Sequence, residues 1–148
     1  MPFIGVISQE NTENCIRRKI IKELNLRESS VLFIKENIKN IKFETVIIER
    51  SFKNTELLKK ILKNATYVVV NSDIDDNLSI LENIEATVVT YGFNSKASIT
   101  TSSVSEEEII ICIQRTFKNK NKEIVEAQEI KLPICENTNC TMAIASTL

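Results

Sequence analysis

The sequence predicts an α/β fold, in which a mainly parallel sheet with flanking helices is extended by antiparallel strands after about residue 92. Up to Gly92, short β-branched runs alternate with segments of helical periodicity, which is the pattern of strand–helix–strand crossovers. After Gly92, β-branched runs follow one another with little room for helices. The 148 residues, 43% of them hydrophobic, show no repeat or linker and fit one domain over residues 1–148.

Five strands are expected in the alternating part, because five short apolar runs there are rich in β-branched residues. These runs lie at Phe3–Ser8, Ser29–Lys35, Phe43–Glu49, Tyr67–Asp73 and Ala86–Gly92. Helices are expected between them, because apolar residues recur three or four positions apart. The helices span Asn11 or Thr12 to about Leu24, Asn54–Asn64 and a short segment within Asp75–Ile84.

Two local rules disagree in the segment from Ser105 to Phe117. Ser105 followed by Glu108 is the signature of a capping box, which favours a helix from Glu106. The run Ile109–Ile113 is β-branched except for one cysteine, which favours a strand. We predict a strand.

A turn at Asn119–Asn121 is expected to pair this strand with Lys122–Gln128 as a hairpin. The last segment, Asn137–Leu148, has the start of a helical pattern. The chain ends within that pattern, which favours a truncation at the C-terminus and leaves apolar residues that need cover. We therefore expect a homo-oligomer or a separate protein partner.

Charge and hydropathy exclude several classes of partner. The 19 basic and 20 acidic residues give a net charge of -1, whereas nucleic acids and anionic membranes select a basic surface. The basic stretch Lys118–Lys122 is interpreted as a solvated turn. No apolar run approaches the ~20 residues that span a bilayer, and the N-terminus lacks the features of a signal peptide. The sequence thus predicts a cytoplasmic protein that binds neither nucleic acid nor membrane.

The four cysteines, Cys15, Cys112, Cys135 and Cys140, are expected to be reduced thiols in that compartment. Cys135 and Cys140 have the spacing C-x4-C, but one such pair in a chain without histidine does not make an ordinary closed zinc site. The absence of histidine also excludes Cys–His and Ser–His catalytic pairs. Cys15, near the start of the first expected helix, is interpreted as a small core residue.

The stretch "IGVISQENTENCIRRKIIKEL" has the strand–loop–helix frame that binds phosphate in many enzymes. The Walker A pattern G-x-x-x-x-G-K-[ST] adds glycines, a lysine for the outer phosphates and a hydroxyl for magnesium. Here Ser8 opens the loop, and Asn11, Thr12 and Glu13 replace a glycine, the lysine and the hydroxyl. Glu13 also adds a negative charge where phosphates would lie. The missing lysine and hydroxyl and this added charge both disfavour the usual mode of ATP binding.

A group of polar residues ends or follows the strand predicted up to Asp73. Asp73, Asp75 and Asp76 can hold a metal at the carboxyl end of a strand, or they form a solvated loop in which Asp75 or Asp76 caps the next helix. No phosphate-binding lysine stands nearby to complete a site, which favours the loop. Asn71 either points into the same crevice or satisfies backbone groups at the strand end.

The chain resembles the central, ATP-binding domain of the Mur ligases, which add amino acids to the peptidoglycan precursor. Its opening is similar to their I-G-V-T-G-T-N-G-K-T-T. "YVVVNSDIDDN" looks like their V-V-N-A-D-D-P, "ATVVTYGFNSKASITTSSV" like V-T-Y-G-L followed by small residues, and "LPICENTNCTMAIASTL" like L-P-G-x-H-N-x-x-N-A-x-A-A. The resemblance implies a P-loop-like sheet and a nucleotide site, whose vestigial positions here are Ser8, Asn11, Thr12, Glu13, Asn71, Asp73 and Asn137.

The departures from the family pattern point away from catalysis. The Walker A lysine and hydroxyl are not present, the middle region lacks the family's histidine and aspartates, and Cys140 stands where a second adenine-site asparagine is expected. Nothing in the chain corresponds to the family's C-terminal domain. We interpret the chain as a catalytically degenerate relative that acts as a binding or interaction module, with no cofactor expected. The alternative is a truncated or split ATP-dependent amino-acid ligase, which uses ATP and magnesium.

Overall fold

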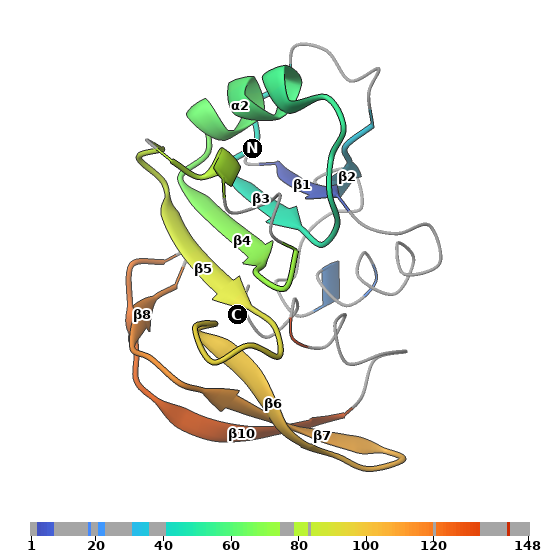
Figure 1. The fold of residues 1–148 in the computed structure, drawn as a ribbon, viewed down its shortest axis with the longest axis vertical. Helices are drawn as coiled ribbons and strands as arrows, with labels where there is room; N and C mark the ends of the chain where they lie inside the picture. Colours follow the sequence, from blue (N-terminus) through green and yellow to red (C-terminus); the bar gives the residue numbers. More distant parts are fainter. Residues whose placement is uncertain are drawn as a thin grey trace.

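The structure is a computed structural model that describes residues 3–7, 18, 21–22, 31–35, 41–74, 79–82, 84–119, 121–133 and 142. These residues form an eight-stranded sheet, a two-stranded sheet and a small amount of helix (Figure 1). The large sheet holds β1 (Ile4–Ile7), β2 (Val31–Phe33), β3 (Thr45–Ile48), β4 (Tyr67–Asn71), β5 (Thr87–Tyr91), β6 (Ile99–Val104), β7 (Glu108–Ile113) and β10 (Gln128–Pro133). The small sheet holds β8 (Phe117–Lys118) and β9 (Ile124–Val125).

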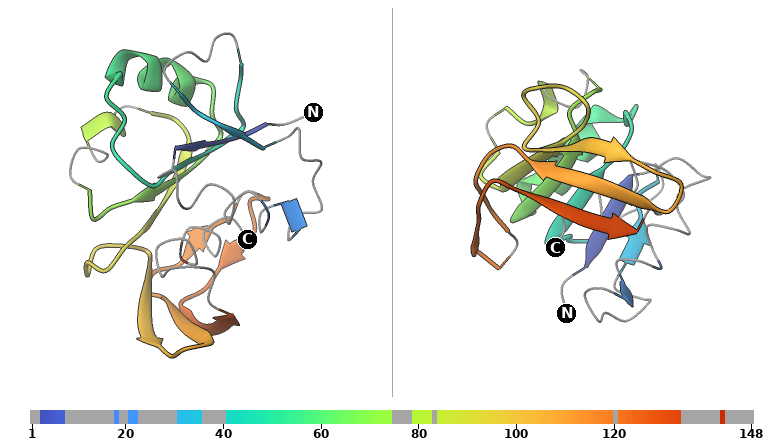
Figure 2. Two further views of the ribbon diagram at one scale, coloured as in Figure 1. Left: turned by 90° about the vertical axis from the view of Figure 1, so that its right-hand side faces the viewer. Right: turned by 90° about the horizontal axis from the view of Figure 1, so that it is seen from below.

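The large sheet is mixed, with the strand order β10-β7-β6-β5-β4-β3-β1-β2. All neighbours from β2 across to β6 are parallel, whereas β7 runs antiparallel to both β6 and β10. Figure 2 shows that β6, β7 and β10 form the end of the sheet that lies farthest from the helix α2. The prediction of a mainly parallel sheet with antiparallel strands after about residue 92 is therefore confirmed.

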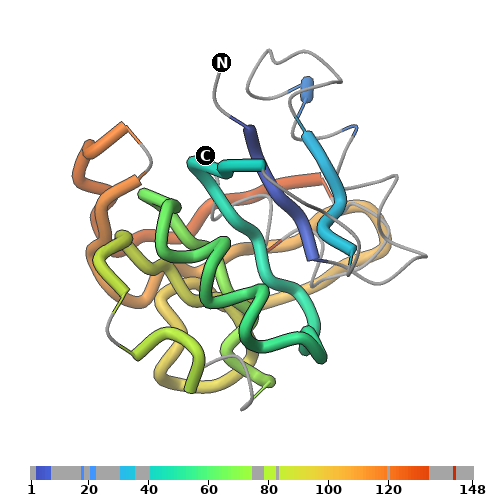
Figure 3. Tube along the Cα trace, turned by 90° about the horizontal axis from the view of Figure 1, so that it is seen from above, coloured from blue at the N-terminus to red at the C-terminus, as the bar shows by residue number. Residues whose placement is uncertain are grey.

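The helix α2 (Thr55–Lys63) covers one face of the parallel strands (Figure 3). It begins where predicted, because the side chain of Asn54 accepts a hydrogen bond from the Leu57 N–H at 3.1 Å. Its buried residues Leu58, Ile61 and Leu62 pack against the sheet. Each such side chain stabilises the fold by about 1.5–3 kcal/mol through the apolar area that it removes from water.

Two separate apolar clusters lie on the two faces of the sheet, and β4 contributes to both. Val68 and Val70 face the cluster that contains α2, whereas Tyr67 and Val69 face the opposite cluster. All five residues of β4 are buried, as expected for a parallel strand that is covered on both sides. The second cluster extends across the antiparallel strands through the alternate residues Ile109, Ile111 and Ile113 of β7 and also includes Met142.

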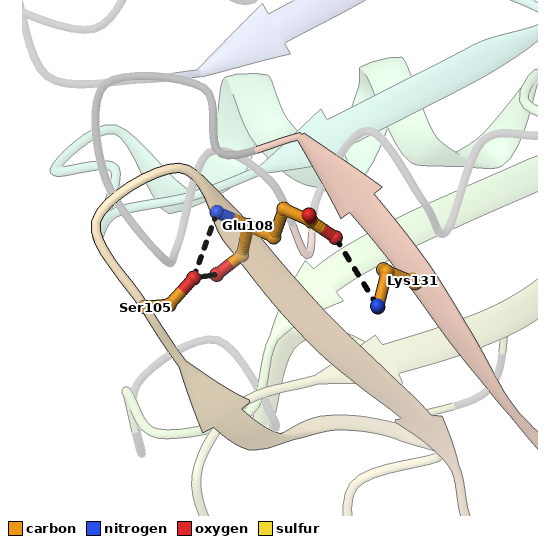
Figure 4. A network of polar contacts seen from close by, with 3 residues as sticks. All are labelled: Ser105, Glu108 and Lys131. Carbon is orange, nitrogen blue, oxygen red and sulfur yellow. Dashed lines mark hydrogen bonds and ion pairs between the residues drawn. The ribbon is translucent and has the colours of Figure 1, made fainter.

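The strand predicted between Ser105 and Phe117 is confirmed as β7. The two residues of the competing capping-box signal, Ser105 and Glu108, form a turn instead of a helix start. Ser105 and Glu108 close the turn between β6 and β7 (Figure 4). The Glu108 N–H donates to Ser105 Oγ at 3.1 Å, and the Ser105 N–H donates to the Glu108 carbonyl at 2.8 Å. A serine that binds the N–H three residues later thus serves a hairpin turn as readily as a helix start.

The predicted partner of this strand is wrong. Of the predicted segment Lys122–Gln128, only the last residue, Gln128, pairs with β7; the strand that pairs with β7 is Gln128–Pro133, which is β10. The turn at Asn119 instead joins the short strands β8 and β9, because Asn119 Oδ1 accepts from the N–H groups of Asn121 and Glu123 at 2.9 and 3.0 Å. Lys122 has a φ of +65° in this turn. The chain therefore makes a small hairpin first and returns to β7 one segment later.

Two of the predicted helices lie mostly outside the described residues. Within the helix expected up to Leu24, the described residues at positions 18, 21 and 22 are helical, and Met142 is helical within the segment expected from Asn137. In the segment Asp75–Ile84, residues 79 and 80 are helical.

Candidate functional site

The carboxyl ends of β1, β3, β4 and β5 meet at one edge of the sheet, because these strands are parallel. The chain crosses from β1 outward to β2 on one side and then to β3 on the other side. In the strand order β2-β1-β3-β4-β5, the direction of the crossovers therefore reverses between β1 and β3. Open α/β sheets bind ligands at such a reversal, outside the carboxyl ends of their strands. We therefore treat this edge as the candidate functional site.

Two buried polar side chains occupy this edge next to the switch point. Glu49, the residue after β3, is 5% exposed, and Asn71, the last residue of β4, is also 5% exposed. Asn71 Nδ2 donates to the Glu49 carbonyl at 3.3 Å, and Asn71 Oδ1 accepts from the Asp73 N–H at 3.1 Å. Of the two roles considered for Asn71, these contacts match the satisfaction of backbone groups at the strand end.

Asp73 is held in a network with the loop that follows β5. Its Oδ2 accepts from the Phe93 N–H at 2.8 Å, and its Oδ1 accepts from Asn94 Nδ2 at 2.7 Å. The same Asn94 nitrogen lies 2.9 Å from Ser72 Oγ. The carboxylate also packs directly on Gly92, where a Cβ would lie 2.6 Å from Asp73 Oδ1. Asp73 thus links the ends of β4 and β5, although its side chain remains exposed.

The loop between β5 and β6 is fixed by further contacts of its own. Asn94 Oδ1 accepts from the Lys96 N–H at 3.0 Å, and the Ser98 N–H donates to Thr90 Oγ1 at 3.0 Å. Phe93 projects from this loop with 59% of its surface exposed. The loop therefore presents an aromatic ring beside a polar network at the carboxyl edge.

Sequence reasoning identified Asn71 and Asp73 at this edge but missed Glu49 and Asn94. Glu49 carries the same signal as Asn71, because each is a polar residue directly after a buried β-branched run. The other predicted positions, Ser8, Asn11, Thr12, Glu13 and Asn137, lie outside the described residues, as do Asp75, Asp76, Cys15, Cys135 and Cys140. Cys112, on β7, is a half-buried free thiol.

Among the described residues, no three acidic, cysteine or histidine side chains gather closely enough to hold a metal ion. A hollow of about 470 Å³ beside α2 lies away from the candidate site. It is lined by Lys59 and Lys63 of α2 and by residues of the segment that leads into β5, including Glu82 and Glu85. Because α2 and that segment precede β4 and β5, this hollow lies towards the amino ends of the strands.

No protein-family model matches the sequence, and no significant match to a curated protein is found. Among the described residues, no helix has the length and apolar character needed to cross a membrane.

Proposed function

We propose that the chain is a catalytically degenerate relative of the Mur ligase central domain, and that it acts as a binding or interaction module through the carboxyl edge of its parallel strands. The engagement of Asp73 is the observation that carries this proposal. Both of its carboxylate oxygens accept hydrogen bonds from the chain itself, from the Phe93 N–H and the Asn94 amide. A carboxylate used in this way holds the ends of β4 and β5 together, which is a structural use at a position where the family resemblance implies a nucleotide site.

The sequence of the loop after β1 supports the same reading. Thr12 and Glu13 stand where a phosphate-binding loop has its lysine and its magnesium-binding hydroxyl. Loss of one electrostatic contact of this kind typically costs a reaction about 2.7–4 kcal/mol of transition-state stabilisation. An added glutamate opposes the phosphates further by like-charge repulsion.

Glu49 is the observation that favours the alternative, a truncated or split ATP-dependent amino-acid ligase. Its carboxylate is buried beside the point where β1 ends and the phosphate-loop segment begins. Carboxylate oxygens are the ligands that Mg²⁺ prefers, and magnesium commonly takes one or two of them together with phosphate oxygens. Glu49 therefore suits a metal–nucleotide complex, whereas the loop residues Thr12 and Glu13 do not.

Titration calorimetry with ATP and magnesium, run beside an ATPase assay, distinguishes the two functions. We expect no turnover and binding no tighter than ~1 mM, which corresponds to about -4 kcal/mol. The triple variant Asn11→Gly/Thr12→Lys/Glu13→Thr should gain affinity if the loop keeps a phosphate-binding shape. Glu49→Gln keeps the size of the side chain while removing its charge, and it should leave the weak binding of the natural protein unchanged.

Micromolar, magnesium-dependent ATP binding by the natural protein would overturn the proposal. Loss of that binding in Glu49→Gln would then assign the metal to Glu49 and support the ligase. An absence of any gain in the triple variant would mean that the resemblance extends to the sheet but not to its nucleotide site.

A further inference from the structure

Among the described strands, β10 is an outer edge of the large sheet. It is the outermost strand beside β7, and no described segment pairs with its other side. It is six residues long and pairs with β7 without a bulge, whereas the strand at the opposite edge, β2, has three residues. In an edge strand, alternate residues point both their N–H and C=O groups outward, where they can bind another strand.

The sequence of β10 is complementary to itself. When two copies of "QEIKL" run antiparallel about a twofold axis at Ile130, Glu129 of one copy lies opposite Lys131 of the other, and the reverse pair forms on the other side of the axis. The same register places the two Ile130 residues opposite each other and Gln128 opposite Leu132. We propose that β10 pairs with β10 of a second copy of this chain, which joins two eight-stranded sheets into one continuous sheet.

Both charged residues lie on the solvent side of the sheet in this arrangement. Glu129 and Lys131 are exposed, and the Lys131 ammonium lies 3.6 Å from the Glu108 carboxylate (Figure 4). Glu108 and Lys131 point to the same face, so in the dimer Lys131 is placed between Glu108 of its own chain and Glu129 of the second copy. No like charges meet across the edge in this register.

The apolar residues of β10 lie on the opposite face. Ile130 and Leu132 pack against the buried cluster of β7 but are only half-buried at the edge. A second copy of β10 covers their open sides with the same residues. Backbone hydrogen bonds supply most of the attraction in such strand pairing, and the side chains set its direction and register.

Lysine and proline on an edge strand also serve to prevent pairing, so Lys131 and Pro133 require an explanation. Pro133 is the last residue of β10 and lies outside the pairs between residues 128 and 132. Lys131 is compensated within its own chain by Glu108 and lies two positions from Glu129, so the edge carries both signs of charge. In the antiparallel register each lysine meets a glutamate across the contact, so the charge of Lys131 does not oppose the pairing.

Sedimentation velocity over a concentration series tests the proposal through charge reversal. Glu129→Lys puts lysine opposite lysine, and Lys131→Glu puts glutamate opposite glutamate, so each single variant should associate about tenfold or more weakly than the natural protein. The edge of Glu129→Lys carries two lysines and the edge of Lys131→Glu carries two glutamates. An equimolar mixture of the two variants should therefore form a heterodimer in which lysine meets glutamate at both positions. The double variant Glu129→Lys/Lys131→Glu should associate more strongly than either single variant, but less strongly than the natural protein, because its glutamate at position 131 lies beside Glu108.

The exposed pair Glu56 and Lys59 on α2 gives a matched control. Its side chains are 3.9 Å apart, and the swap Glu56→Lys/Lys59→Glu should leave association unchanged because α2 lies away from β10. Circular dichroism of each variant checks the fold, and recovery in the mixture excludes misfolding as the cause of a loss. A natural protein that stays monomeric up to ~1 mM would overturn the proposal. Single variants that dimerise normally, or a mixture that fails to recover, would also overturn it. These outcomes do not depend on nucleotide binding, so this inference and the proposed function can fail separately.

Discussion

Replacement of Gly92 by alanine is expected to lower the free energy of unfolding by about 2–5 kcal/mol, because this position has no room for a β-carbon. An ideal Cβ would lie 2.6 Å from Asp73 Oδ1 and 2.9 Å from Asp73 Oδ2, and φ at Gly92 is +156°. That backbone conformation costs other residues about 1–3 kcal/mol. The displaced carboxylate also loses its bonds to the Phe93 N–H and the Asn94 amide, which at this exposed position are worth about 1–2 kcal/mol together.

A double-mutant cycle with Asp73→Ala separates these two causes. Asp73→Ala alone should cost about 1–2 kcal/mol, because it removes the two hydrogen bonds without a clash. When the clash acts through the carboxylate, the double variant is about as unstable as Gly92→Ala alone, and the coupling energy is about 1–2 kcal/mol. Urea unfolding followed by circular dichroism gives all four free energies.

Two results would refute this reasoning. A loss of less than about 0.5 kcal/mol in Gly92→Ala would mean that the backbone and Asp73 relax at little cost. Strict additivity of the two substitutions would mean that the alanine acts without displacing the carboxylate, and that the backbone conformation alone explains the glycine.

Two further predictions concern the buried faces of the sheet. Leu58→Ala should lower the free energy of unfolding in urea by about 2–5 kcal/mol, because Leu58 on α2 is fully buried against the sheet. Leu57→Ala, at a half-buried position of the same helix, should lower it clearly less. Equal losses of stability in the two variants would contradict the packing described for α2. Burial raises the pKa of the Tyr67 phenol well above its ordinary value of 10.0, so the folded state holds this proton more tightly than the unfolded state does. Its contribution to stability is complete below pH 10 and falls as the pH rises further, by up to about 1.4 kcal/mol per pH unit. Tyr67→Phe should remove this part of the decline in the free energy of unfolding at alkaline pH. If the free energies of unfolding of both proteins fall in parallel between about pH 9 and pH 11, Tyr67 does not contribute to the decline.

Local patterns were sufficient to predict most of the described strands of the sheet. Tyr67–Asn71 and Thr45–Ile48 are β-branched or aromatic at nearly every position, and such runs are stable only when both faces of the strand are covered. The start of α2 followed from Asn54, whose side chain forms the expected cap. Strand order did not follow from these signals, because it depends on contacts between residues far apart in the chain.

The errors have identifiable physical causes. The hairpin rule joins a strand to the next extended segment, but the side chain of Asn119 closes a small hairpin first and shifts the pairing with β7 to Gln128–Pro133. At the candidate site, Asp73 was identified among neighbouring aspartates, but its function as a link depends on Asn94, which is twenty-one residues away. Glu49 was assigned to the end of a strand, and its burial depends on strands that pack around it only in the folded protein.

The parallel pairing of β1 has a consequence for how the protein folds during synthesis. Among the described strands, β1 pairs with β2 and β3, and β3 ends about 40 residues after β1 does. At a synthesis rate of about 5–20 residues per second, the apolar strand Ile4–Ile7 waits about 2–8 s for its second partner. The antiparallel end of the sheet has no such delay, because β6 and β7 are joined by a tight turn and a hairpin forms within about 1–10 μs. Among the described strands, β1 therefore waits longest for its second partner, and a chaperone that binds the nascent chain would find its target there.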